Sequence, residues 1–319
     1  MKKCLLSLLL CLGLLIACGG PAPAVSSSPS DSGGAAAGQT QPVEPDGVPS
    51  LAEDETPAYL TCRVVDGAEE GNLLLAELDA PLSGGHDGRH DGKGVYRLTV
   101  TEDTPVYLDG RPASSGDLTD GMPLEIVFNG LVLESFPAQL GEVYSVSGYS
   151  IGTPQCPGGG YYDLCGLYLQ ALEDLWEKDP ALNEKISLIS LDLSQAPGGL
   201  LESEKAALVW RFGELHGAEA LDLTFEELRE QGYLTASSLS TPEPAEGDSP
   251  LWYSWEDGCL FSIRANSGHQ GEVYSLPILF FDVEKWRTPL AAYCLYDCSA
   301  LWPEMGTWDG YKIGSEMIS

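Results

Sequence analysis

Between residues 58 and 150, short stretches of alternating apolar and polar residues are separated by turn signals. Alternation with a period of two is typical of half-buried strands, and Asp109-Gly110 after an apolar stretch indicates a tight turn. No stretch of this region has a helical period, so the pattern predicts a small all-β barrel or sandwich. The expected strands are Thr61–Val65, Asn72–Leu78, Val95–Val100, Pro105–Leu108, Leu124–Phe128 and Glu142–Ser147.

After residue 163 the spacing of apolar residues changes. Leu164, Leu167 and Tyr168 begin a repeat of three and four residues, which predicts an amphipathic helix with Asp163 as its N-cap. Glu202–His216 predicts a second helix, and a short third helix follows. Helices followed by an antiparallel sheet make this domain, and the chain overall, α+β. The expected strands are Ile186–Leu193, Leu251–Trp255, Cys259–Arg264, Val273–Phe281, Leu290–Cys298 and Trp308–Ile313.

The first 57 residues fit neither pattern. Lys2 and Lys3 precede an apolar run, Leu5–Ile16, that is too short to span a bilayer and has the form of a cleaved export signal. Residues 19–57 are rich in Gly, Ala, Ser, Pro and acidic residues and have no period, which predicts a disordered tether.

Leu15-Ile16-Ala17-Cys18 resembles a bacterial lipobox. The resemblance implies cleavage before Cys18, a diacylglycerol on its sulfur, and an additional acyl chain such as palmitate, because one chain binds membranes only marginally. The protein is then expected on the outer face of the bacterial cytoplasmic membrane, anchored by its lipid. The expected organisation is a signal peptide at 1–17, the lipidated cysteine and tether at 18–57, a β domain at 58–150, a linker at 151–163 and an α+β domain at 164–319.

The chain is strongly acidic, with 48 Asp and Glu against 16 Lys and Arg and a formal net charge of -32. Affinity for nucleic acids comes chiefly from Lys and Arg that neutralise phosphates, so no nucleic-acid partner is expected. The same charge repels anionic lipids and wall polymers. We interpret it as a solvated surface, with divalent-cation binding as the lesser alternative.

Six cysteines remain beyond Cys18, and outside the cytoplasm they permit disulfides without requiring them. Cys156 and Cys165 flank a loop and are the candidate disulfide, with buried or otherwise paired thiols as the alternative. Cys294 and Cys298 are expected on one face of one strand. Their Cα atoms would lie ~13 Å apart, too far for a disulfide.

Two family resemblances bear on the fold. The first is to an uncharacterised OB-fold-like domain of Gram-positive lipoproteins, which implies an OB-like barrel at the cell surface and no assigned catalytic residues. It rests on Thr101–Val106, Gly116–Leu118, Val127–Gly130 and Leu133–Gln139, while the loop Ser83–Gly94 departs from it. The α+β domain resembles uncharacterised exported proteins of gut-type Gram-positive bacteria, and this implies no function. That resemblance rests on Ser203–Lys205, Trp255–Phe261, Lys285–Arg287 and Gly314–Ser319.

One loop carries a group of side chains typical of metal ligands: His86, Asp87, His90 and Asp91. Imidazole and carboxylate at this density are suited to zinc or calcium. Glycine at every third or fourth position favours the alternative, a solvated hairpin loop. Apart from the lipid on Cys18, no cofactor is expected.

Aromatic residues gather on a predicted hairpin, where Trp252 and Trp255 are candidate ligand-binding residues. Such side chains stack on sugars or flat ligands, but more often they form core and cross-strand pairs. Glu256 and Asp257 beside them are the residues on which a hydrolase would rest. No complete catalytic constellation is present, so no catalytic residue is assigned.

These observations predict a non-enzymatic surface lipoprotein that binds an envelope glycan, peptide or protein. OB-folds commonly bind oligomeric ligands on one barrel face, which makes a glycan or peptide a plausible ligand. One alternative is an extracellular hydrolase with its site in the C-terminal domain. The other is an accessory protein of a membrane complex.

Overall fold

The computed structural model describes residues 56–78, 94–150, 163–238, 251–269, 278–302, 306 and 308–319. The chain divides into two compact units, residues 1–44 and residues 45–319, and every described residue belongs to the second unit. Within the described residues, no helix is both long enough and apolar enough to cross a membrane.

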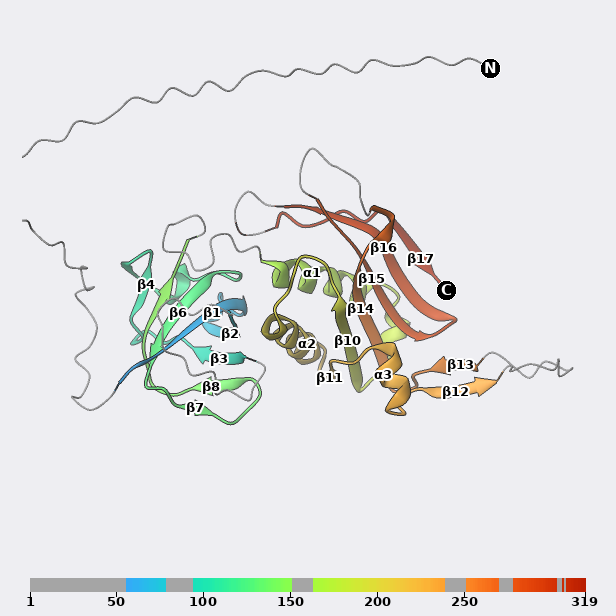
Figure 1. Ribbon diagram of the computed structural model, residues 1–319, viewed down its shortest axis with the longest axis horizontal. Coiled ribbons are helices and arrows are strands. Elements are labelled where there is room, and N and C mark those ends of the chain that lie inside the picture. Colours follow the sequence, from blue (N-terminus) through green and yellow to red (C-terminus); the bar gives the residue numbers. More distant parts are fainter. Residues whose placement is uncertain are drawn as a thin grey trace, which may run out of the picture. The chain divides into compact units, whose positions relative to one another are not determined.

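The N-terminal half of the described chain is a nine-stranded sheet with the order β5-β4-β9-β6-β1-β2-β3-β8-β7 (Figure 1). Leu60, Leu75 and Ile126 belong to its apolar core, because alternate residues of a strand face the same side. The strands are β1 (Ala58–Asp66), β2 (Asn72–Glu77), β3 (Val95–Thr99), β4 (Val106–Leu108), β5 (Arg111–Ala113), β6 (Pro123–Phe128), β7 (Val132–Leu133), β8 (Ala138–Leu140) and β9 (Val143–Gly148).

All six strands expected in this region are confirmed. The pattern missed β5, β7 and β8, which have only two or three residues each and are too short to show a period. The pairings run from β5 at one edge to β7 at the other, so the described strands do not close into a barrel.

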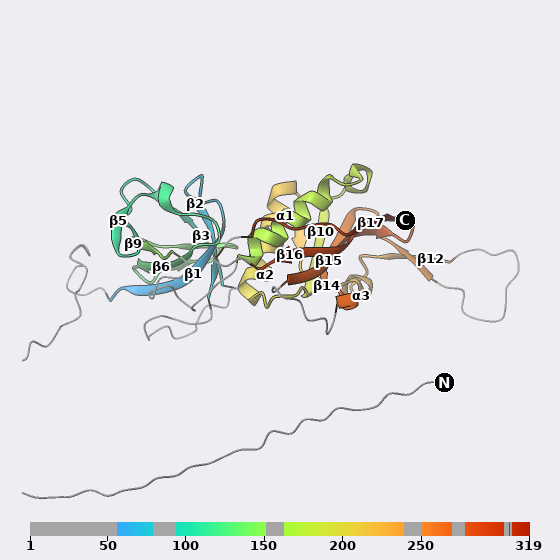
Figure 2. The same cartoon turned by 90° about the horizontal axis from the view of Figure 1, so that it is seen from above.

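The C-terminal half combines three helices with a six-stranded sheet of order β11-β10-β14-β15-β16-β17 and a two-stranded sheet, β12-β13. Helices α1 and α2 pack on one face of the larger sheet (Figure 1, Figure 2). The elements are α1 (Leu164–Glu177), β10 (Leu188–Gln195), α2 (Glu202–His216), β11 (Glu219–Leu221), α3 (Phe225–Glu230), β12 (Thr235–Ser238), β13 (Leu251–Ser254), β14 (Gly258–Ala265), β15 (Ile278–Thr288), β16 (Ala291–Leu301) and β17 (Ser315–Ile318).

The strands from residue 251 onward pair with one another in antiparallel fashion, as predicted. The sheet as a whole is mixed, because the earlier strand β10 pairs in parallel with both β11 and β14. Helix α2 follows β10 and carries the chain across the sheet, and such a crossover is what parallel neighbours require. The strand expected at Trp308–Ile313 is also absent. Lys312 makes only an isolated bridge to Ser299, and β17 begins three residues later.

A β-bulge overturns the prediction that Cys294 and Cys298 face the same side. The register with β15 shifts by one residue between Leu295 and Cys298, where Asp297 adopts a left-handed φ of 52°. Because side chains alternate along a strand, one extra residue reverses every face that follows. Cys298 therefore lies in the core beneath α1 and α2, while Cys294 is buried outside that core.

Candidate functional site

Helix α2 joins the two halves of the described chain. Val65, Leu74 and Val95 from the N-terminal sheet belong to the same apolar core as α1 and α2. The hydroxyl of Ser203 in α2 donates a hydrogen bond to the backbone oxygen of Glu77 in β2 at 2.6 Å. The two halves therefore share a packed junction.

A buried ion pair crosses this junction. The Nε atom of Arg63 in β1 donates to Oε1 of Glu204 in α2 at 2.9 Å, and the two side chains are only 2% and 6% exposed. The other carboxylate oxygen of Glu204 accepts from the backbone nitrogen of Leu201 at the start of the helix. Loss of either partner would leave an uncompensated buried charge, so the pair favours this packing of α2 on β1.

Asp163 lies buried beside the pair and caps α1. Its Oδ1 atom accepts from the backbone nitrogen of Gly166 at 2.9 Å. Burial raises the pKa of Asp163 to about 6, although the hydrogen bond from Gly166 and the charge of Arg63 oppose the shift. Gly121 makes room for this carboxylate, because a Cβ atom there would lie 2.7 Å from Cβ of Asp163.

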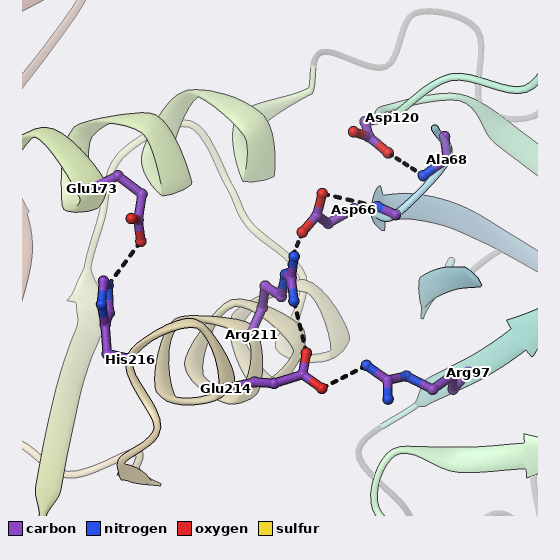
Figure 3. Close-up of polar contacts among 9 residues, drawn as sticks. Asp66, Ala68, Arg97, Asp120, Glu173, Arg211, Glu214 and His216 are labelled. Carbon is purple, nitrogen blue, oxygen red and sulfur yellow. Dashed lines mark hydrogen bonds and ion pairs between the residues drawn. The ribbon is translucent and has the colours of Figure 1, made fainter. Parts of the chain in front are cut away.

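Further along α2, the junction opens into a polar cavity of about 170 Å³, which we call the junction pocket. A chain of alternating charges runs along it, from Asp66 to Arg211, Glu214 and Arg97 (Figure 3). Glu214 accepts from Arg211 at 2.8 Å and from Arg97 at 2.7 Å. The lining residues are Asp66, Gly67, Glu70, Asn72, Leu74, Arg97, Arg211 and Glu214.

The two guanidinium groups retain unused donors. Nε of Arg97 is buried and has no hydrogen-bond partner, while its guanidinium lies 4.6 Å above the ring of Trp210. Among the described residues, Nη1 of Arg97 and Nη2 of Arg211 make no hydrogen bond. Arg97 and Arg211 both line the pocket, so these Nη groups are the donors suited to a ligand that supplies acceptor oxygens.

Carboxylates balance these donors within the same pocket. Glu70 is exposed and forms no ion pair with any described residue. Among the described Lys, Arg and His side chains, only Arg211 forms an ion pair with Asp66. Asp120 lies close by, where burial raises its pKa against the opposing hydrogen bond from Ala68 (Figure 3). The pocket therefore offers both positive and negative groups to one small ligand.

The turn between β1 and β2 holds the acidic side of the pocket in place. Gly67 has a left-handed φ of 92°, and a Cβ atom there would lie 2.2 Å from the backbone oxygen of Asn72. Its backbone nitrogen donates to Oδ1 of Asp66 at 2.8 Å, which orients that carboxylate. Only glycine allows this close return of the chain.

A second polar contact joins α1 to α2 outside the pocket. Nε2 of His216 lies 2.9 Å from Oε1 of Glu173 (Figure 3). The His216 ring stacks on Trp176, with 3.6 Å between centroids. These contacts pack the two helices together and contribute no side chain to the junction pocket.

The residues proposed from the sequence do not meet in one site. Trp255 is 1% exposed and packs against Leu228 and Leu234, so its indole is part of a core and is not open for stacking on a ligand. Trp252 is half-buried on β13. Glu256 and Asp257 are exposed in the turn before β14.

Other proposed residues lie outside the described part of the chain. These are Cys18, the loop residues His86, Asp87, His90 and Asp91, and Cys156. Cys165 is described as a buried thiol whose pKa is raised by burial, and its pairing with Cys156 stays a prediction. Among the described residues, no three His, Cys, Asp or Glu side chains are arranged to hold a metal ion.

Sequence reasoning did not find the junction pocket. Asp66 and Arg211 are 145 positions apart, and no motif links them. Two weak signals were present: Asp66-Gly67 is a turn signal, and Arg211 and Glu214 are spaced three residues apart on one helix face. Comparisons with known protein families, with curated proteins and with solved structures gave no match.

Proposed function

We propose that this chain is a lipid-anchored extracytoplasmic binding module that holds a small dipolar ligand in the junction pocket. The observation that carries the proposal is the set of unused donors on Arg97 and Arg211 beside the carboxylates of Asp66 and Glu70. The lipobox supports attachment to the outer face of the cytoplasmic membrane through Cys18. The all-β strand pattern and the family resemblance support an OB-like fold for residues 58–150.

The pocket chemistry favours an amino acid or the charged end of a peptide. A ligand carboxylate would accept from the free N–H groups of Arg97 and Arg211, in charge-assisted hydrogen bonds that are stronger than neutral ones. A ligand ammonium would lie against Glu70 and Asp66. A junction between two folded parts is a frequent place for such sites, because each part contributes side chains.

The proposal is tested by thermal unfolding and calorimetry of the mature chain with amino acids, dipeptides and wall peptides. A ligand at ~100 times its Kd adds about 2.7 kcal/mol to the stability of the folded state. We expect such a shift, and we expect Arg97→Gln to abolish it. The matched control is Arg111→Gln, an exposed arginine on β5, which should bind as the original chain does.

Acetylation of the ligand's amine tests the acidic side of the pocket separately from its arginine side. The original chain should prefer a free amine over its N-acetylated form, and Glu70→Gln should reduce that preference without removing binding. If no amino acid or peptide binds, or if Arg97→Gln binds normally, the assignment of the pocket is wrong.

Anchoring is tested separately. Cys18→Ser removes the thiol that would receive the lipid, so the protein should leave the membrane fraction or remain as an unprocessed precursor. Fractionation and mass spectrometry of the N-terminus measure both results. A Cys18→Ser protein that is still cleaved and membrane-bound contradicts the lipoprotein prediction.

A further inference from the structure

The hairpin formed by β7 and β8 exposes three large apolar side chains within six residues. Leu131, Leu133 and Phe136 are 63%, 55% and 52% exposed. Leu131 and Leu133 are two positions apart and share one face of the strand, whereas Val132 between them packs against the core. The hairpin therefore presents three large apolar side chains to its surroundings, with the exposed Glu134 and Ser135 between the second and the third.

Hydrogen bonds hold this edge in shape. The backbone oxygen of Leu131 accepts from Gly141 at 2.8 Å, which closes the base of the hairpin. At the tip, the backbone nitrogen of Ser135 donates to the oxygen of Leu133 at 2.9 Å, and the Ser135 hydroxyl donates to the oxygen of Pro137 at 2.8 Å. A preformed surface loses little conformational entropy when it is covered.

The hairpin begins where the described fold begins. Gly130, just before Leu131, lies against Ala58 at the start of β1, since a Cβ atom on Gly130 would be 3.6 Å from Cβ of Ala58. Forty residues separate Ala58 from Cys18. The tether expected from the composition of residues 19–57 has a root-mean-square span of roughly 35 Å, so a lipid on Cys18 would keep this end of the fold near the bilayer.

We propose that the β7–β8 hairpin contacts the membrane that anchors the protein, with Leu131, Leu133 and Phe136 entering the interfacial region of the bilayer. The proposal rests on the lipid anchoring in the proposed function. Aliphatic and aromatic side chains gain free energy at that depth through apolar burial. With a net charge of -32 the chain is repelled by anionic lipid, so the contact should be strongest on uncharged phosphatidylcholine.

The test uses the full lipidated protein in phosphatidylcholine vesicles with a fluorescent label at one introduced cysteine. Glu134→Cys places the label on the hairpin, and Glu102→Cys is the matched control. Glu102 is an exposed glutamate just after β3, whose last residue pairs with Asn72 at the opposite end of the sheet from Ala58. The readout is quenching of the label by spin-labelled phosphatidylcholine.

We expect severalfold stronger quenching at position 134 than at position 102. Replacing Leu131, Leu133 and Phe136 by serine should lower quenching at position 134 to the control level, while the protein still pellets with the vesicles through its lipid. Equal quenching at both positions in the unsubstituted hairpin overturns the membrane contact and leaves the anchoring intact. Failure of every version to associate with vesicles contradicts the anchoring and the contact together.

Discussion

At the scale of single residues, the junction between the two halves contains ionisable side chains that are buried and desolvated. Arg63 and Glu204 form an ion pair with each other. Asp163 lies beside them, where its carboxylate accepts a hydrogen bond from the backbone nitrogen of Gly166 and interacts with the charge of Arg63. Its pKa of about 6 lies above the ordinary value of 3.8 for an aspartate side chain. Folding therefore takes up a proton at Asp163 between about pH 4 and pH 6. The contribution of this group to stability is greatest below that window and declines as the pH rises through it.

Asp163→Asn should remove this pH dependence. The amide oxygen still caps α1, but it cannot ionise, so the variant should exceed the original chain in stability by about 2–3 kcal/mol at pH 7.5 and match it near pH 4. Urea unfolding at both pH values measures the difference. Asp103→Asn, at an exposed position, is the control. A constant difference across the pH range would contradict the raised pKa.

At the scale of elements, a buried lysine on β15 caps the C-terminal end of α1. The Lys285 side chain of β15 is completely buried, and its Nζ donates to backbone oxygens of Trp176, Lys178 and Asp179. These carbonyls at the end of α1 have no partner within the helix. Burial lowers the pKa of Lys285. The Lys285 ammonium group thus connects the end of α1 to β15.

Lys285→Met keeps the length of the side chain and removes the donor. The backbone oxygens of Trp176, Lys178 and Asp179 would then lose the buried hydrogen-bond donor that they share. We therefore expect a loss of roughly 2–4 kcal/mol in the free energy of unfolding. Hydrogen exchange should increase first around residues 176–183. Lys312→Met, at an exposed lysine, should change neither quantity. Unchanged protection near residue 178 would show that Lys285 does not hold the helix end.

At the scale of the whole molecule, the two halves of the described chain pack against each other within one compact unit, residues 45–319. Apolar residues from the N-terminal sheet enter the core formed by α1 and α2, and the Arg63–Glu204 pair is sealed within that contact. Neither sheet can lose α2 without exposing apolar surface. We therefore expect the two halves to unfold together.

Two probes can follow the halves separately, because all seven tryptophans lie after residue 175. Tryptophan fluorescence reports the C-terminal half, and hydrogen exchange of residues 58–148 reports the other. Their urea transitions should coincide in the original chain. Glu204→Gln removes the carboxylate that pairs with the buried Arg63 guanidinium, so it should cost about 3–5 kcal/mol and pull the transitions apart. Separate transitions in the original chain would contradict a single cooperative unit.

The local elements follow from the amino-acid pattern alone. Helix α2 spans Glu202–His216 as its pattern predicts, and the cap at Asp163 forms as expected, because helix periodicity and capping depend on residues within a few positions. The strands with five or more residues in the N-terminal half form where the sequence pattern predicts them, for the same reason.

Which faces and which distant residues meet depends on how the folded elements pack. The bulge at Asp297 reversed the side of Cys298, and the pairing of β10 with β14 was parallel rather than antiparallel. The junction pocket joins β1 to α2 across 145 positions. Strand order, register shifts and long-range charge pairs arise from the packing of whole elements. Their energies are shared among residues far apart in the chain, so no local pattern records them.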